Sequence, residues 1–277
     1  MKKAFIIVAL LVSLSLACSF SSIVSEITGG DAPAGEVDVR EQEVVEEIVP
    51  TDEPIQVDLS SGLAAQFQLN GNGVDVYGDL VSQALNTDAA ADRFGDPNGA
   101  LRFNGVDSFI EVQDNDLLDL TGDFTIAFFI EGNPESDHEW LIMTKHQAGV
   151  CQPADTSWMI RFQEEMGLRF VNYDTSVDCG KVILAAPDVN LLDGQWHHVA
   201  FVNSETDQEM RLFFDGVLVV RTDNTELNIA NNSIPLMIGN QFEGVPQHAL
   251  DAVLDDLYIF QIALDANQVA ALVVRRQ

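Results

Sequence analysis

The stretch from 193 to 220 constrains the fold most. It contains three apolar runs, at 196–202, 210–214 and 217–220; apolar residues alternate with others in the first two, and a turn signal separates the second run from the third. Apolar side chains recur at every second position of 196–202 and of 210–214, a period of two that predicts antiparallel strands with alternating faces. Asp215-Gly216 supplies a two-residue turn, since both positions of such a turn must tolerate positive φ. The stretch therefore predicts a three-stranded antiparallel meander.

Similar short runs, bounded by Gly, Asn, Asp and Pro, predict strands in the rest of 59–277. They lie at 64–69, 101–103, 109–112, 124–130, 140–145, 158–162, 168–172, 181–184, 236–238 and 253–260. The period changes near the end, where Asp265 has the side chain of a helix cap and Val269 and Leu272 would form the buried stripe of a short helix over 264–272. Many short strands in a region of this length favour one all-β sandwich.

The meander resembles that of the laminin G-like, concanavalin A-like jelly-roll family, which carries a similar Asp-Gly-x-Trp-His-His-Val-Ala strand followed by Leu-x-Phe-x-Asp-Gly. Other landmarks of that family recur here in the same order. They are Arg93-Phe94-Gly95, 101–110 with its Asn104-Gly105 turn, 120–126, Ile238-Gly239-Asn240 and 254–264. The resemblance covers roughly Leu59 to the last residue. It implies an antiparallel jelly-roll sandwich of two sheets with a short C-terminal helix.

Residues 1–18 have the pattern of an export signal, in which two lysines precede an apolar run that is too short to span a membrane. The segment 14–18 resembles a bacterial lipoprotein box, although its leucine lies one place further from Cys18 than is usual. We expect an exported protein that is anchored by lipid on Cys18 at a membrane, at the cell surface. The alternative is an ordinary cleaved signal in which Cys18 has no role.

Residues 19–58 contain eleven acidic residues and one arginine. Such a segment buries too little apolar surface to offset its conformational entropy, so it is predicted to be a disordered, extended tether. The whole chain has a formal net charge of −31 and no cluster of Lys or Arg. This charge makes nucleic acid and anionic lipid poor partners, and it suits a secreted protein that stays soluble or binds cations.

Two further cysteines, Cys151 and Cys179, lie on either side of the hairpin expected over 158–172. An exported protein with one pair of cysteines usually oxidises them, and a loop of this size would add roughly 3 to 4 kcal/mol of stability. We therefore expect a disulfide. The alternatives are two separate thiols or a metal-binding pair, although no third or fourth ligand with zinc-like spacing lies nearby.

A structural Ca²⁺ ion is implied by the family resemblance, because many laminin G-like jelly rolls bind one with loop oxygens. The matching positions are Asn72, Asp75, Asp107 and Asp255. Adjacent strand residues point to opposite faces, so only one of Asp255 and Asp256 is expected at a given site. The first loop departs from the family pattern, and the alternative is that these acidic loops bind nothing.

The sequence lacks the motifs of the hydrolases that share this fold, which argues against catalysis. Retaining hydrolases of the laminarinase type share this sandwich and carry Glu-x-Asp-x-x-Glu on one strand, a pattern that this sequence lacks. Glu111 and Asp114 are three apart and would face opposite sides, and no Gly-x-Ser-x-Gly, His-Glu-x-x-His or phosphate loop occurs. The sequence thus predicts a module that is not an enzyme.

Carbohydrate is the favoured ligand, alone or on an extracellular protein, because flat aromatics beside carboxylates and amides grip sugar rings. The candidate contacts are Trp140, Trp158, Tyr173 and Asp174. Two alternatives stay open. The first is an adhesin or scaffold that binds protein, and the second is an unfamiliar glycan hydrolase or lyase.

Overall fold

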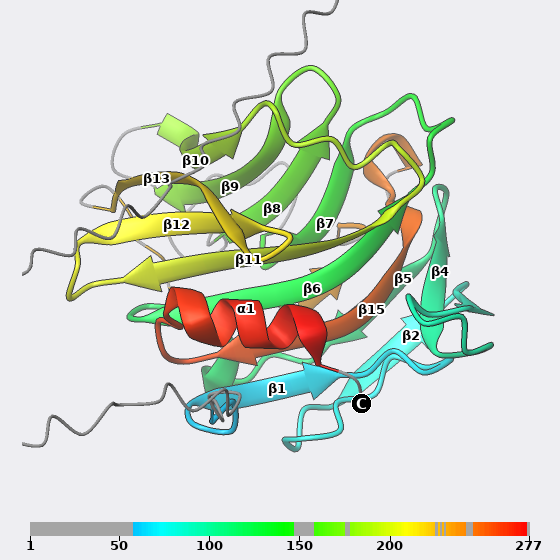
Figure 1. Ribbon diagram of the computed structural model, residues 1–277, viewed down its shortest axis with the longest axis horizontal. Coiled ribbons are helices and arrows are strands. Elements are labelled where there is room, and N and C mark those ends of the chain that lie inside the picture. The colour runs from blue at the N-terminus through cyan, green and yellow to red at the C-terminus, as the bar shows by residue number, and fades with distance from the viewer. Residues whose placement is uncertain are drawn as a thin grey trace, which may run out of the picture. The chain divides into compact units, whose positions relative to one another are not determined.

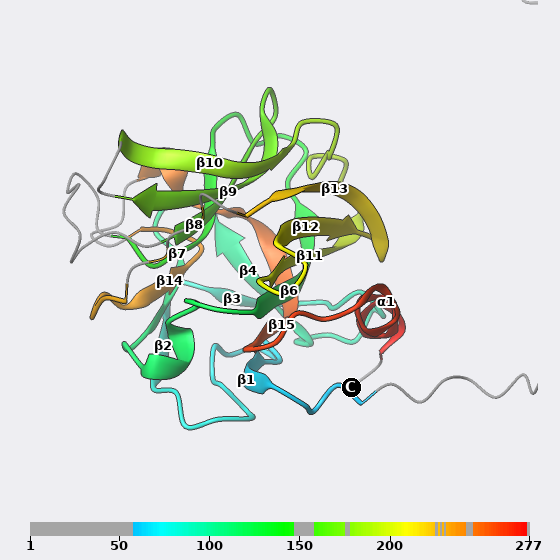
Figure 2. The same cartoon turned by 90° about the vertical axis from the view of Figure 1, so that its left-hand side faces the viewer.

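The computed structural model describes residues 58–146, 158–174, 178–224, 227, 229, 231–241 and 246–275. In this part of the chain the strands form two antiparallel sheets, of eight and seven strands, as expected for a jelly-roll sandwich. Aliphatic and aromatic side chains from both sheets meet in one core between them. Figure 2 shows the two sheets as successive layers. No helix within the described ranges is long and apolar enough to cross a membrane.

The larger sheet contains the predicted meander and the long strand near the end of the domain. Its strands are β1 (Leu63–Phe67), β3 (Asp88–Ala90), β4 (Ala100–Asn104), β6 (Phe124–Gly132), β11 (Trp196–Ser204), β12 (Glu209–Phe214), β13 (Val217–Asp223) and β15 (Asp251–Phe260). Their order is β13-β12-β11-β6-β15-β4-β3, with β1 paired to β15. The meander is confirmed, and its turn has the positive φ values that an Asp-Gly turn requires, 49° at Asp215 and 77° at Gly216.

The smaller sheet lies on the other side of the core (Figure 1). Its strands are β2 (Ser82–Leu85), β5 (Phe109–Val112), β7 (Trp140–Thr144), β8 (Trp158–Gln163), β9 (Gly167–Asp174), β10 (Asp178–Ala186) and β14 (Leu236–Ile238), with the 3-10 helices η1 (Asp116–Leu118) and η2 (Pro246–His248) in connections. The order is β10-β9-β8-β7-β14-β5-β2. The strands on either side of the Asn104-Gly105 turn do not pair with each other: β4 belongs to the larger sheet and β5 to the smaller one.

The predicted C-terminal helix is confirmed as α1 (Ala266–Val274). Asp265 caps it in a capping box with Gln268, so the backbone N–H groups of these two residues have partners. Val269 and Leu272 are fully buried and pack on the outer face of the larger sheet, against side chains of β6, β11, β12 and β15. Figure 1 shows α1 lying over these strands, which explains why β11 is buried on both of its faces.

Several predictions concern residues outside the described ranges. They are the export signal with Cys18, the tether of 19–58 and Cys151. Cys179 lies in β10, but its side chain is not among those described. The lipid anchor and the disulfide therefore stay predictions from the sequence.

Candidate functional site

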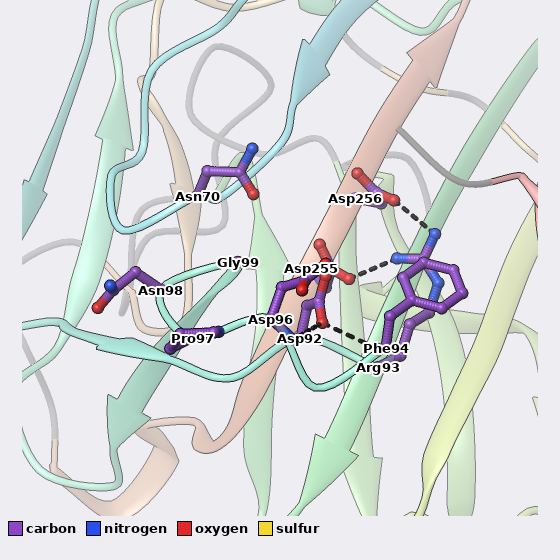
Figure 3. Close-up of a pocket in the computed structure, with 10 residues that line it drawn as sticks. All are labelled: Asn70, Asp92, Arg93, Phe94, Asp96, Pro97, Asn98, Gly99, Asp255 and Asp256. Carbon is purple, nitrogen blue, oxygen red and sulfur yellow. Dashed lines mark hydrogen bonds and ion pairs between the residues drawn. The ribbon is translucent and has the colours of Figure 1, made fainter.

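A polar hollow of about 280 Å³ lies on the outer face of the larger sheet (Figure 3). It is lined by Asn70, by residues 92–94 and 96–99 of the loop between β3 and β4, and by Asp255 and Asp256 of β15. We call it the Arg93 hollow, because Arg93 joins its parts.

Arg93 connects three segments that are far apart in the sequence. Its guanidinium donates to Oδ2 of Asp255 and lies 2.7 Å from Oδ2 of Asp256. Its Nη2 also donates to the backbone oxygen of Arg275, just after α1, at 2.7 Å. Only 8% of its side chain is exposed. Arg93 therefore ties the β3–β4 loop to β15 and to the end of the helix.

Asp255 and Asp256 reach the same guanidinium because β15 is irregular at this point. The register between β15 and β6 shifts between Asp255 and Tyr258, and Asp256 has a φ of 47°. An extra residue of this kind breaks the alternation of faces along a strand. The expectation that only one of the two carboxylates serves a given site was wrong for this reason. Figure 3 shows both side chains directed toward Arg93.

The electrostatic balance of the hollow is negative. Asp92, Asp96, Asp255 and Asp256 line it together with one arginine. Burial, and next the charge of Asp256, raise the pKa of Asp255 to about 7 in spite of Arg93. Burial also raises the pKa of Asp256. The hollow thus concentrates more negative charge than its single guanidinium neutralises, and it favours a proton or a cation.

One carboxylate oxygen of Asp256 in the hollow lacks a hydrogen-bond partner among the described residues. The residue is 2% exposed, and the oxygen is its Oδ1. A buried carboxylate oxygen without a donor is costly, because burial removes the water that would otherwise hydrate it. Since Asp256 lines the cavity, a donor bound there could satisfy this oxygen.

The rim of the hollow is a tight turn that displays an aromatic ring. Oδ1 of Asp92 accepts the backbone N–H groups of Phe94, at 2.9 Å, and of Asp96, at 2.8 Å, which fixes the turn. Phe94 is 42% exposed, and the Arg93 guanidinium lies 4.4 Å from the centre of its ring. The amide side chains of Asn70 and Asn98 complete the lining. A partly exposed aromatic residue, amides and carboxylates therefore meet at one place.

Beneath Arg93 lies a row of side chains across three strands. His198 of β11, Phe129 of β6 and Asp255 of β15 occupy paired positions. The guanidinium of Arg93 sits 3.9 Å from the centre of the Phe129 ring, and the His198 ring meets Phe129 edge-on with centroids 4.9 Å apart. Burial lowers the pKa of His198 to about 4, so this ring is neutral at physiological pH.

The side-chain carboxylate of Asp75, one of the predicted calcium ligands, accepts hydrogen bonds from backbone N–H groups. Its Oδ1 accepts the N–H groups of Gln66 at 2.9 Å and Tyr77 at 3.1 Å. Its Oδ2 accepts those of Gly78 at 3.0 Å and Leu80 at 3.4 Å. The carboxylate holds the first loop in shape, and its four acceptor positions are used.

Asn72 and Asp107 are likewise engaged within the protein. Oδ1 of Asn72 accepts the N–H of Val74 at 3.0 Å. The two oxygens of Asp107 accept amide groups of Asn104 at 2.9 Å and Asn86 at 3.0 Å. Across the described ranges, no three His, Cys, Asp or Glu residues are placed so that they could hold a metal ion. Asp75, Asn72 and Asp107 thus accept hydrogen bonds within the protein, and calcium binding stays a prediction from the sequence.

The predicted sugar contacts are not gathered at a surface. Trp140 and Trp158 are fully buried in the core between the sheets, where Trp158 stacks on Phe170. A fully enclosed ring cannot stack on a ligand, so these two assignments are corrected: both tryptophans are core residues. Tyr173 and Asp174 end β9, and their side chains lie outside the described set.

Apart from Asp255, the residues of the Arg93 hollow are not predicted as a site. In the sequence, Arg93-Phe94-Gly95 is a landmark of the fold, and strand alternation places Asp255 and Asp256 on opposite faces. The signal that could have found the hollow is a lone arginine between acidic residues in a chain that is poor in arginine, followed by an aromatic residue. Its acidic partners, more than 160 positions away, could be found only from the fold.

Comparison with known proteins agrees with the fold just described, a concanavalin A-like jelly roll. The model of the concanavalin A-like lectin/glucanases superfamily matches residues 104–270, which is more than half of the chain. The chain belongs to this family. No curated protein matches the sequence.

Solved structures with the same fold include toxin binding domains. The binding domain of Paraclostridial mosquitocidal protein 1 is 18% identical, with a TM-score of 0.60 over 76% of this chain and 52% of that chain. The botulinum neurotoxin serotype D binding domain is 15% identical, with a TM-score of 0.59 over 76% and 51%. The serotype D ligand-binding domain in complex with N-acetylneuraminic acid is 14% identical, with a TM-score of 0.58 over 76% and 50%. The chain thus spans about half of their length, and these identities establish a shared fold alone.

Proposed function

We propose that the jelly-roll domain is a non-catalytic binding module that recognises carbohydrate, free or on an extracellular glycoprotein, in the Arg93 hollow. The observation that carries this proposal is the exposed ring of Phe94 beside the carboxylate and amide oxygens of one cavity. Membership of a family that includes lectins supports it. An anchor on Cys18 would hold the module at a membrane surface. A structural Ca²⁺ ion stays a prediction from the sequence, and the proposed recognition of carbohydrate does not depend on it.

The size and chemistry of the hollow suit a small sugar. A cavity of about 280 Å³ lies at the lower end of the roughly 300–1,000 Å³ that is typical of ligand pockets, so one or two sugar rings would fill it. The Phe94 ring offers an apolar face for a sugar ring, and the oxygens of Asn70, Asn98 and Asp96 can accept hydrogen bonds from hydroxyl groups.

An enzymatic alternative has one observation in its favour, since a carboxyl group with a pKa of about 7 in a cavity resembles a general acid. The arrangement around it argues against hydrolysis. Glycosidases need two carboxyl groups on opposite sides of the scissile bond. Asp255 and Asp256 are instead neighbours in the chain, and both face one guanidinium. This geometry supports binding over catalysis.

The test is a glycan-binding screen of the full chain, followed by calorimetry with the best ligand. We expect the substitution Phe94→Ala to weaken binding by at least about fivefold, because it removes a stacking contact of roughly 1 kcal/mol or more. Val81→Ala is the control, since Val81 is also exposed, at 58%, but does not line the hollow. Binding of no glycan, or unchanged binding by Phe94→Ala, would refute the proposal.

A further inference from the structure

We infer that the Arg93 hollow selects sugars that carry a free, protonated amino group over neutral and anionic sugars. This inference rests on the proposed function and names the ligand class of the same site. It follows from the charge of the lining, from one buried oxygen, and from the way in which Arg93 is already bound.

The charge of the lining favours a cation. Four carboxyl groups line the cavity, against one guanidinium. That guanidinium is committed, because it contacts Asp255, Asp256 and the backbone oxygen of Arg275. Its two terminal nitrogens are therefore already paired, and the carboxyl groups around them would repel an acidic sugar. A protonated amine would instead offset part of the repulsion between the carboxyl groups.

The unpartnered oxygen is an observation independent of the charge count. Asp256 lines the cavity and is 2% exposed, and no described residue donates to its Oδ1, which is itself buried. An ammonium group has three N–H donors and a full charge, so it makes the charge-assisted bond that is roughly twice as strong as a neutral one. A hydroxyl group supplies a single neutral donor, and an acetylated amine supplies a neutral N–H with a bulky substituent.

The raised pKa of Asp255 is consistent with this ligand. Burial and the charge of Asp256 make its ionised form unfavourable. A cation bound between these carboxyl groups would favour ionisation again. The shared fold of the neurotoxin domain that was solved with N-acetylneuraminic acid does not extend to its ligand, because that acidic sugar would meet four carboxyl groups here.

The experiment compares three β1,4-linked disaccharides that differ only at carbon 2. They are cellobiose with a hydroxyl group, the glucosamine disaccharide with a free amine, and its di-N-acetyl form. Each is titrated into the full chain slightly below neutral pH in moderate salt, and putrescine is titrated as an amine without a sugar. We expect the free-amine disaccharide to bind at least about tenfold more tightly than cellobiose, which corresponds to about 1.4 kcal/mol.

The matched variants are Asp256→Asn and Asp137→Asn. Each removes one negative charge from the chain, but the side chain of Asp137 is 99% exposed and does not line the hollow. We expect Asp256→Asn to lower the affinity for the free-amine disaccharide to that for cellobiose, and Asp137→Asn to leave it unchanged. The ligand comparison needs no variant, so it still decides if Asp256→Asn does not fold.

Four results would overturn the inference while leaving carbohydrate binding intact. They are equal binding of the three disaccharides, tighter binding of the acetylated form, an equal loss in Asp137→Asn, and putrescine competing as well as the free-amine disaccharide. If no disaccharide and no screened glycan binds, the proposed function itself fails. The two failures are therefore distinguishable.

Discussion

Two groups of buried charge, one on each sheet, look alike in composition but differ in how completely they are satisfied. At the end of the smaller sheet, Lys145 follows β7 and its side chain is fully buried. Its Nζ bonds Asp114 at 2.8 Å and Asp119 at 3.1 Å, and the backbone oxygen of Asn232 at 2.6 Å. The amide oxygen of Asn232 adds a fourth contact at 3.1 Å. The ammonium group is thus surrounded by protein oxygens.

The Arg93 hollow on the larger sheet is incomplete by comparison. Among the described residues, Nε of Arg93 and Oδ1 of Asp256 are buried without hydrogen-bond partners. They belong to residues that line an open cavity, whereas Lys145 lines none of the cavities described. A closed cluster can contribute only to the fold, but an incomplete one can be completed by a ligand. The difference teaches that buried charge becomes a candidate site where its partners are missing.

The largest effect that would sharpen this comparison is expected from Lys145→Met. The substitution leaves Asp119 and the Asn232 oxygens buried without their cation, so we expect the free energy of unfolding to fall by about 3 to 5 kcal/mol. Denaturant titration measures it. Arg221→Met is the control, because that exposed side chain lies 3.8 Å from Glu209 and should change stability by less than about 0.5 kcal/mol. A loss below about 1 kcal/mol for Lys145→Met would contradict the structural role.

A second test measures how the free energy of unfolding depends on pH. His198 and Asp255 are expected to change it in opposite directions. The pKa of His198 is lowered in the folded state from 6.5 to about 4, so the unfolded chain binds more protons and stability rises between about pH 4 and 6.5. The pKa of Asp255 is raised from 3.8 to about 7, so the folded chain binds more protons and stability falls as pH rises through that window. The wild type should show a partial cancellation.

Substitution of one residue at a time separates the rise of stability with pH that comes from His198 from the fall that comes from Asp255. His198→Phe should remove a rise on the order of 3 kcal/mol and leave a net fall toward neutral pH. Asp255→Asn should remove the fall and leave the rise. Unfolding free energies from pH 4 to 8 measure both, and subtraction of the wild-type curve cancels the other titrating groups. Parallel curves for all three proteins would show that neither group is perturbed by burial.

The fold could be predicted where local pattern and tertiary structure agree. The alternation in 196–214 and the Asp215-Gly216 turn led directly to the meander, and Asp265 with Val269 led to the helix. Pattern did not reveal β2 and β3, because these short, partly exposed strands have little apolar alternation. It also did not reveal that the Asn104-Gly105 turn carries the chain from one sheet to the other, since hydrogen-bond partners are decided by the whole sandwich.

The site could be predicted only in part. Asp255 was named, but its partner Arg93 lies far away in the sequence, and the bulge that brings Asp256 beside it arises from pairing with β6. Strand alternation is a rule for regular strands and fails at such a bulge. The prediction that Trp140 and Trp158 contact a ligand is wrong because residue type alone does not distinguish a buried core ring from a ring at the surface.

The smallest predicted change in stability, after those for Lys145 and for pH, is expected at Asp75. Both carboxylate oxygens of Asp75 accept hydrogen bonds, whereas one oxygen of Asp256 does not. All four contacts of Asp75 are backbone N–H groups, so Asp75→Asn replaces one acceptor oxygen with a donor that faces Gly78 and Leu80 or Gln66 and Tyr77. We expect a loss of about 2 kcal/mol, because two backbone donors lose their acceptor. Thermal melts with millimolar Ca²⁺ and with EGTA measure it, and the wild-type midpoint should be the same in both. A midpoint that rises with Ca²⁺ in the wild type but not in Asp75→Asn would instead restore Asp75 as a calcium ligand and break its comparison with Asp256.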